Sequence, residues 1–401
     1  MGFAIKQTAI KPLKYFLGVI FVLMLMGCGS DSSSKSNSTS NKESFQKYTY
    51  QIPALRNDGW QVSHVDEFSI DATKLEALIH KIAQERDGYR HIDSVTIIKS
   101  NKIILDEMFR DKLDLADDWA NNRDINLHIL NSVTKSFTSA LIGIAIDQGY
   151  IDGVDVKVHD YFAHKLPVSN WSDEKATITI ENWLTMQHGY NWDEWNISYL
   201  DNNNLNSRMN NSSDPINFLL SRPMETAPGT TFAYSTGVSF GLGRLLEHAT
   251  GQSVTSFMEQ NLFSPLGVTD YTFWALDNQL HTGSALYLSQ RDMAKFGQLF
   301  LNKGQWNDEQ VISESWVEQS TQRNYDNGNW GYGYQWWSTS FSGQGQQINS
   351  FYGDGFGGQY IFVLPKLDAV VVFTGNGYQD GDMDEYRVWS IMENDVVPAL
   401  F

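Results

Sequence analysis

The distribution of strand-like and helix-like segments limits the fold of this chain more than any other feature. Runs rich in β-branched and aromatic residues lie near both ends of the chain, and helical periodicity dominates the middle. This arrangement predicts one antiparallel sheet built from both ends of the chain and flanked by helices, an α+β fold with a helical region inserted at about residues 150–330. The predicted strands are 95–98, 103–108, 331–337, 358–364 and 368–374.

Helices are predicted where apolar residues recur with a period near 3.6. The most apolar of them begins at Ser132 and ends before Gly149. Asp71 is placed to cap an earlier helix. The predicted helices are 73–86, 132–148, 180–187, 238–249, 290–302 and 384–392.

The first 28 residues have the pattern of an export signal. Three lysines precede an apolar run at 15–26, which is too short for a stable bilayer-spanning helix and typical of a signal peptide. The run ends in Leu25-Met26-Gly27-Cys28, which resembles the lipobox of bacterial lipoproteins. The resemblance implies removal of residues 1–27 and attachment to a lipid bilayer through acylated Cys28. The alternative is an ordinary cleaved signal with an incidental cysteine. The Ser- and Asn-rich stretch 28–45 is expected to be a tether.

Composition excludes several classes of protein. The formal charge of −18 argues against a nucleic-acid partner, because phosphate binding depends on clustered Lys and Arg. The single cysteine excludes a disulfide framework and a multi-cysteine metal site, and the nine histidines show no metal-ligand spacing. The acidic run 380–384 opens like a calcium loop, but Glu385 and Ile391 occupy positions that need glycine and glutamate. We therefore predict a solvated acidic turn and no metal site.

One Ser-x-x-Lys sequence has a context that favours catalysis. Of four such spacings, only Ser132-Val133-Thr134-Lys135 opens a long apolar helix. Residues three apart share a helix face, so the Lys135 amine can reach the Ser132 hydroxyl, and the helix N-terminus offers N–H groups to a developing oxyanion. Burial would lower the pKa of the lysine toward that of a usable base. The alternative is a capping serine beside a lysine that extends to solvent.

A tyrosine about a hundred residues later is a candidate partner for this pair. Tyr234 follows a turn and precedes a helix, and a tyrosine near a lysine can exist partly as phenolate or relay a proton to a leaving group. The neighbouring Gly-x-Ser-x-Gly at 237–241 matches a nucleophile motif. We interpret Ser239 instead as a serine packed within a helix, because no buried strand precedes it.

Four segments of the chain form a recognisable set: SVTK at 132–135, APGTTFAYSTG at 227–237, GSALYLSQRDMAKFGQLFLNKGQW at 283–306 and GGQYIFVLPKLDAVVVFTG at 357–375. Together they resemble the serine β-lactamase and penicillin-binding-protein superfamily, in particular the branch of class C β-lactamases, family VIII esterases and 6-aminohexanoate-dimer hydrolases. The resemblance runs from about residue 50 to the end and implies a single domain at 46–401 with the β-lactamase/DD-peptidase-like fold. It also implies cofactor-free acyl transfer, in which Ser132 attacks an ester or amide, Lys135 takes its proton, Tyr234 assists and the acyl-enzyme hydrolyses.

Two positions depart from the family pattern. Thr236 replaces an asparagine that bonds substrate and lysine, and Asp354 replaces a basic residue that holds the carboxylate of β-lactams. An acidic residue there repels a substrate carboxylate, which disfavours β-lactamase or carboxypeptidase activity. Gly355 is retained, and the resemblance places the backbone N–H groups of Phe356 and Ser132 as the oxyanion hole.

Three further aromatic residues are weighed as pocket residues. The resemblance implies that Tyr190 contacts substrate, together with Thr236 and Gly355. A plain loop aromatic is an equal alternative for Tyr190. Trp336 and Trp337 follow a glycine- and tyrosine-rich run and are interpreted as core residues.

The function expected is that of a lipid-anchored serine hydrolase acting on a small ester or amide, with no cofactor. The location expected is the bacterial cell envelope, on the periplasmic side of the outer membrane, because Gly29 and Ser30 lack the aspartate that marks inner-membrane retention. One alternative is a β-lactamase or D-Ala-D-Ala-type peptidase. Another is a non-catalytic tethered binding protein with a decayed site.

Overall fold

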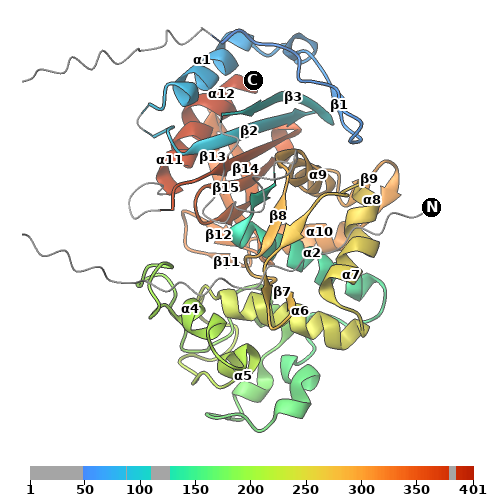
Figure 1. The fold of residues 1–401 in the computed structure, drawn as a ribbon, viewed down its shortest axis with the longest axis vertical. Helices are drawn as coiled ribbons and strands as arrows, with labels where there is room; N and C mark the ends of the chain where they lie inside the picture. The colour runs from blue at the N-terminus through green and yellow to red at the C-terminus, as the bar shows by residue number, and fades with distance from the viewer. Residues whose placement is uncertain (1–47, 87, 110–126, 379–384) are drawn as a thin grey trace, which may run out of the picture.

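A central sheet organises the molecule. The computed structural model describes residues 48–86, 88–109, 127–378 and 385–401 (Figure 1). Within these residues the sheet has nine strands in the order β1-β3-β2-β16-β15-β14-β13-β12-β11, and every neighbouring pair is antiparallel except β1 and β3. The strands are β1 (Gln61–Val62), β2 (Ile92–Lys99), β3 (Lys102–Met108), β11 (Tyr325–Asp326), β12 (Gly331–Tyr332), β13 (Trp337–Gly343), β14 (Gln346–Gly355), β15 (Gln359–Leu364) and β16 (Ala369–Gly375).

The two ends of the chain meet in the middle of this sheet. Strand β16 lies between β2 and β15, and Val370 pairs with Ile98 while Val372 pairs with Thr96. In Figure 1 the blue and red strands accordingly lie side by side. The prediction of one mainly antiparallel sheet built from both termini is confirmed.

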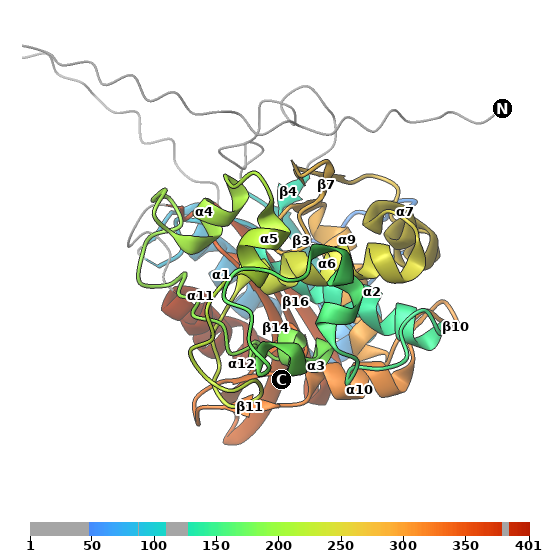
Figure 2. The same cartoon turned by 90° about the horizontal axis from the view of Figure 1, so that it is seen from below.

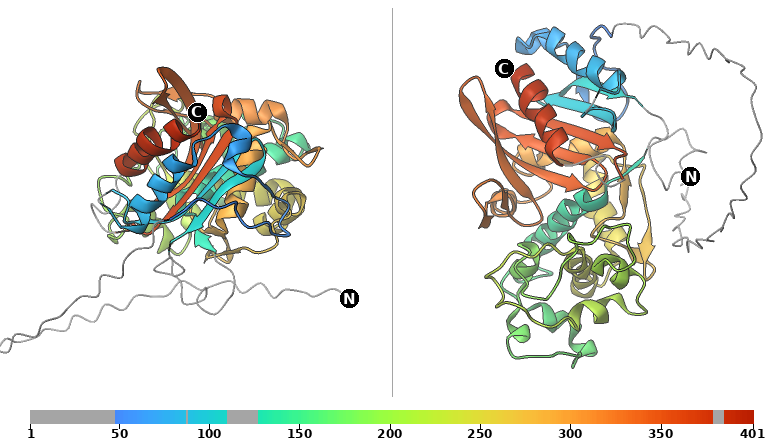
Figure 3. Two further views of the ribbon diagram at one scale, coloured as in Figure 1. Left: turned by 90° about the horizontal axis from the view of Figure 1, so that it is seen from above. Right: turned by 90° about the vertical axis from the view of Figure 1, so that its left-hand side faces the viewer.

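Helices cover both faces of the sheet because its central strands are apolar on both sides. Along β16, Val371 and Phe373 belong to one buried cluster, and Val370 and Val372 belong to the other. Helices α1 and α12 pack on the first face (Figure 3), and α9 packs on the second against β16, β15 and β2. The bounds are α1 (Ala72–Ala83), α9 (Gln290–Leu301), α11 (Glu385–Ile391) and α12 (Val397–Ala399).

A mostly helical region lies beyond the second face (Figure 2). Its central helix α2 (Thr134–Asp147) is buried around its whole circumference over most of its length, as expected for a helix that is apolar on every side. Gly143 permits a close contact there, since a Cβ at this position would lie 2.4 Å from the Trp316 ring. The remaining helices of this region are α3 (Ile180–Leu184), α4 (Leu205–Asn210), α5 (Pro215–Leu220), α6 (Thr236–Thr250), α7 (Val254–Met258), α8 (Ser264–Leu266) and α10 (Glu314–Thr321).

Short strand pairs complete the fold. Strand β8 pairs with β4 and β5 at the edge of the helical region, and two further hairpins lie in loops. The strands are β4 (His128–Ile129), β5 (Thr272–Phe273), β6 (Ala275–Leu276), β7 (Gln279–Leu280), β8 (Leu286–Leu288), β9 (Gln305–Trp306) and β10 (Glu309–Gln310).

Several predicted boundaries change. The strand predicted at 331–337 is the two-residue strand β12, a turn and the first residue of β13, and Gln335 in that turn has φ of 61°. The helix predicted at 180–187 ends at Leu184. In the part of the chain that the structure describes, no helix combines the length and apolarity needed to cross a bilayer. The predicted signal, tether and acidic turn at 380–384 lie outside the described residues.

Candidate active site

The start of α2 presents a serine and a lysine to each other. Asn131 has φ of 45°, a left-handed conformation in which asparagine is tolerated, and a 3₁₀ turn over Asn131–Val133 leads into the helix. Ser132 is half-buried in that turn, and Lys135 lies in the first turn of α2 with its side chain buried. The Lys135 Nζ lies 2.9 Å from the Ser132 Oγ. The predicted pair is therefore assembled.

Three further groups surround the lysine amine. The Nζ lies 3.1 Å from the Thr236 Oγ1 and 2.8 Å from the Gly283 carbonyl oxygen, and it sits 4.9 Å from the centre of the Tyr234 ring. Burial lowers the pKa of Lys135 from its ordinary value to about 8, although the negative charge of Glu194 opposes this shift. Part of the lysine population is thus neutral near neutral pH and can accept a proton.

Tyr234 lies beside the same pair. It precedes α6, and its contact with Ser132 is a hydrogen bond that lowers the tyrosine pKa. Burial outweighs this contact and raises the pKa of Tyr234 well above the ordinary value for tyrosine. The phenol is therefore neutral at physiological pH, so a proton relay fits this site and a phenolate does not.

The end of β14 closes the site on the other side of Ser132. A Cβ at Gly355 would lie 2.3 Å from the Leu130 carbonyl oxygen, so only glycine permits this approach of strand and turn. The Asn131 Nδ2 donates to the Phe356 carbonyl oxygen at 2.6 Å. The backbone of Phe356 is thereby held beside the Ser132 turn.

A buried glutamate completes the site, and sequence reasoning missed it. Glu194 Oε2 accepts from the Thr236 backbone N–H at 2.8 Å, and Oε1 accepts from the Thr236 hydroxyl at 2.6 Å. Glu194 also accepts from Trp192 Nε1 at 2.7 Å and from the Tyr199 hydroxyl at 2.9 Å. Thr236 thus connects Glu194 to Lys135. Glu194 follows no spacing motif in an Asn-rich loop, so the sequence carries no signal for this role.

Tyr190 is not brought together with the catalytic candidates. Its side chain is 1% exposed, its ring stacks on His188, and the Lys175 Nζ lies 5.7 Å from the ring centre. Because the side chain is enclosed in the core away from the pocket, the structure gives no support for a substrate contact there.

Of the remaining aromatic and serine residues, two lie where the sequence predicts them and one does not. Trp336 is fully buried, as predicted, whereas Trp337 lines a pocket and stacks on Tyr234 at 5.6 Å between ring centres. The core interpretation was therefore wrong for Trp337. Ser239 is buried inside α6 and donates to the Gln335 Oε1 at 2.6 Å, which confirms its interpretation as a packed serine.

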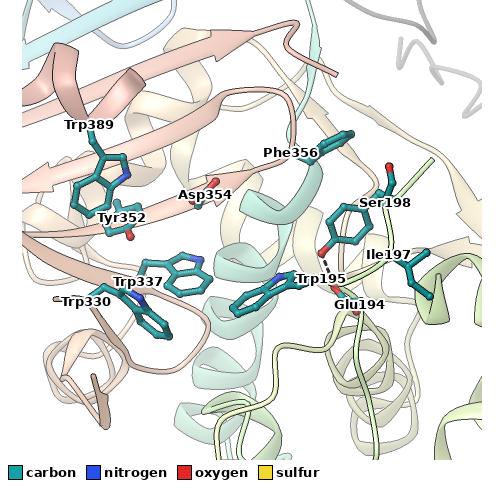
Figure 4. Close-up of a pocket in the computed structure, with 11 residues that line it drawn as sticks. Glu194, Trp195, Ile197, Ser198, Trp330, Trp337, Tyr352, Asp354, Phe356 and Trp389 are labelled. Carbon is teal, nitrogen blue, oxygen red and sulfur yellow. Dashed lines mark hydrogen bonds between the residues drawn. The ribbon is translucent and has the colours of Figure 1, made fainter. Parts of the chain in front are cut away.

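A pocket of about 410 Å³ opens beside Tyr234 (Figure 4). Trp195, which is 54% exposed, stacks on Tyr234 at 5.3 Å and forms one wall together with Trp337. Asp354 and Phe356 line the pocket from the β14 side. The remaining lining residues are Glu194, Ile197, Ser198, Tyr199, Trp330, Tyr352 and Trp389.

Comparison with known proteins identifies relatives of this chain. The chain is 25% identical over 275 residues to 6-aminohexanoate-dimer hydrolase of Paenarthrobacter ureafaciens, covering 61% of this chain and 65% of that protein. It is 27% identical over 221 residues to esterase EstB of Burkholderia gladioli, covering 51% and 53%. It is 23% identical over 192 residues to lovastatin esterase of Penicillium rubens, covering 44% and 46%. The matches therefore span about half to two-thirds of these relatives.

Solved structures share the fold at lower identity. A family VIII carboxylesterase superposes with a TM-score of 0.59 at 15% identity, covering 82% of this chain and 98% of that one. A penicillin-binding protein from Bacillus halodurans superposes with a TM-score of 0.60 at 17% identity, covering 79% and 99%. A family model described as beta-lactamase matches residues 80–393, which is most of the chain. The chain belongs to the beta-lactamase family.

Proposed function

We propose that this protein is a serine hydrolase that cleaves a small ester or amide through an acyl-enzyme on Ser132. The observation that carries the proposal is the 2.9 Å contact between the Lys135 Nζ and the Ser132 Oγ, with the pKa of Lys135 lowered to about 8 by burial. A serine hydroxyl becomes a nucleophile when a neighbouring base can take its proton. The esterases and the dimer hydrolase among the relatives support this class of reaction.

The proposed reaction begins with proton transfer from the Ser132 hydroxyl to the neutral Lys135 amine as the Oγ attacks the substrate carbonyl carbon. The backbone N–H groups of Ser132 and Phe356 hold the resulting oxyanion. The bond to the alcohol or amine then breaks, and the leaving group takes a proton from Lys135 through the Tyr234 hydroxyl. Water repeats the sequence on the acyl-enzyme and releases the acid.

The fold also admits β-lactam or D-Ala-D-Ala substrates, but Asp354 disfavours them. These substrates present a carboxylate, and Asp354 brings a negative charge close enough to Lys135 to oppose the lowering of its pKa. We expect slow turnover of nitrocefin and of a D-Ala-D-Ala peptide relative to short esters. Turnover of either at the rate of a good ester would favour the peptidase or β-lactamase alternative instead.

The decisive experiment is covalent labelling of the full chain in detergent. A fluorophosphonate probe should label the wild type covalently, and the wild type should hydrolyse a nitrophenyl ester. Both signals should be lost in Ser132→Ala. Ser239→Ala is the matched control, because Ser239 is a buried helix residue that the mechanism does not use. Equal labelling of the wild type and Ser132→Ala would refute the assignment. Binding of the nitrophenyl ester by the wild type with no hydrolysis would favour the binding-protein alternative.

We also propose that the protein is anchored to the cell envelope through acylated Cys28, facing the periplasm. The Leu25–Cys28 sequence after an apolar run supports this. In Cys28→Ser, we expect the protein to move from the detergent phase to the aqueous phase on Triton X-114 partitioning. Partitioning that does not change with this substitution would contradict the anchor.

A further inference from the structure

The pocket beside the catalytic candidates has walls of an unusual composition. Indole rings form much of its surface, and they contact one another or the neighbouring tyrosine. Trp330 lies 5.0 Å from Trp337, and Tyr352 lies 5.3 Å from Trp389, measured between ring centres and with the rings edge to face in both pairs. Such an arrangement presents several electron-rich ring faces to one small volume.

The formal charges that line this pocket are negative. Asp354 and Glu194 are the carboxylates among the lining residues, and none of the described lining residues is Lys, Arg or His. Glu194 accepts hydrogen bonds from Thr236, Trp192 and Tyr199 and is nearly fully buried. Asp354 is only half-buried, and Figure 4 shows its carboxylate in the middle of the view with Trp337 on one side and Phe356 on the other.

Asp354 is also close to the reacting groups. It immediately precedes Gly355 and Phe356, the residues that hold the β14 end against the Ser132 turn. Its negative charge opposes the lowering of the Lys135 pKa by burial and adds to the raising of the Tyr234 pKa. One small molecule can therefore meet Asp354 with one end and Ser132 with its carbonyl.

We propose that this pocket binds an ammonium group carried by the substrate, so that the hydrolysed compound is a cationic amino ester or amino amide. The inference rests on the proposed hydrolase function and names its substrate class. A cation over an indole face is attracted by the negative face of the ring, and the attraction is stronger when the cation is desolvated. The Asp354 carboxylate adds attraction for a cation and repulsion for an anion.

Trp195 and Trp337 make the ammonium site continuous with the catalytic site. Both rings stack on Tyr234, with ring centres 5.3 and 5.6 Å from that of the tyrosine. The Tyr234 ring thus contacts the tryptophan wall, and the hydroxyl of the same tyrosine contacts Ser132. A substrate with only a few bonds between its ammonium group and its carbonyl can reach both.

The test compares two acetate esters of matched shape. One carries a 2-(trimethylammonio)ethyl group and the other an uncharged 3,3-dimethylbutyl group, and a third ester with a 2-aminoethyl group distinguishes a primary from a quaternary ammonium. We expect the wild type to hydrolyse at least one cationic ester with kcat/KM at least tenfold above that of the neutral ester. A ratio near one, or a preference for the neutral ester, would overturn the proposal.

Substitution of the carboxylate provides the second arm. In Asp354→Asn the ratio should fall about tenfold, and in Asp354→Glu the preference for the cation should persist. Asp308→Asn is the matched control, since it removes one carboxylate from an exposed turn that does not line the pocket and should leave the ratio unchanged. A ratio that stays the same in a folded Asp354→Asn would overturn the role of Asp354.

A binding measurement separates this inference from the proposed function. Four tryptophans line the pocket, so tetramethylammonium should change the intrinsic fluorescence of Ser132→Ala, which cannot turn over substrate. Saturable binding there, lost in the double variant with Asp354→Asn, supports the ammonium site even if no ester is hydrolysed. Hydrolysis without any such binding or preference would leave the hydrolase and refute the ammonium site.

Discussion

Among single residues, Lys135 connects the geometry of the site to a measurable pH dependence. Its pKa is lowered to about 8 because its side chain is buried, and only the neutral amine accepts the Ser132 proton. We therefore predict that kcat/KM for a neutral ester rises about tenfold per pH unit below pH 8 and levels off above it. A pH–rate profile of the wild type with this ester measures the midpoint. A profile that is flat from pH 6 to 9 would contradict the role of Lys135.

Glu194→Gln supplies the check on this prediction. The negative charge of Glu194 raises the pKa of Lys135, so its removal should move the midpoint to lower pH. Asp193→Asn is the control, because Asp193 is exposed and neighbours Glu194 in sequence. A midpoint that moves equally in both variants would show that the effect is a general change of surface charge.

Individual residues were predictable where local spacing alone brings them together. Ser132 and Lys135 share one helix face, so their contact could be read from the sequence. Glu194 could not, because it reaches Thr236 only through the path of an irregular loop. Tyr190 illustrates the opposite case, since its position along the chain is compatible with a site contact but its side chain is enclosed in the core.

At the scale of elements, the junction of β14 with the turn before α2 determines the shape of the predicted oxyanion hole. We predict that Gly355→Ala lowers kcat about 10²–10³-fold with a smaller change in KM, because the added Cβ would meet the Leu130 carbonyl and push the Phe356 N–H away. Steady-state kinetics with a good ester measures this change. Asn349→Ala, an exposed change on the same strand, should have no such effect. Unchanged kcat in a folded Gly355→Ala would place the oxyanion donors elsewhere.

Helices and strands were predictable where their apolar periodicity is regular, and their prediction was unreliable where turns interrupt it. The helix at α2 and the hairpin of β2 and β3 were found because their apolar patterns are continuous. The run 331–337 contains a turn at Gln335 with a positive φ, which amino-acid preference does not reveal. Strand β14 was missed because glycine and polar residues interrupt its apolar positions.

At the scale of the whole molecule, one buried ion network fastens the segment before the sheet to the core. The Arg291 Nε lies 2.9 Å from the Asp106 carboxylate, and its Nη1 lies 2.6 Å from the carboxylate of Asp58. Thr96 also donates to Asp106. We predict that Asp106→Ala lowers the free energy of unfolding by about 3 kcal/mol, because Arg291 loses its buried carboxylate partner and keeps only the more exposed Asp58.

Urea unfolding followed by circular dichroism measures this loss. Glu67→Ala is the comparison, since it removes an exposed partner of Lys102 and should change the midpoint little. Similar midpoints for the two variants would show that the buried network is energetically unimportant.

The overall architecture was the most predictable level because it depends on many residues at once. Strand patterns at both ends and helical patterns between them allow few arrangements that bury every apolar face. The pocket was the least predictable, because its walls come from distant segments. Trp195 belongs to a loop in the helical region and Trp389 to the closing helix α11, and nothing in either local sequence indicates the other.

The position of β16 between β2 and β15 also determines when the sheet can be completed during synthesis. A nascent chain that has reached residue 350 already carries the serine, the lysine and the tyrosine, yet it lacks the strand end that approaches the serine turn and the strand that joins the two halves of the sheet. Domains complete themselves only when their long-range partners have emerged. We therefore expect no activity until nearly the whole chain has been synthesised, and a partly synthesised chain should lack an assembled active site.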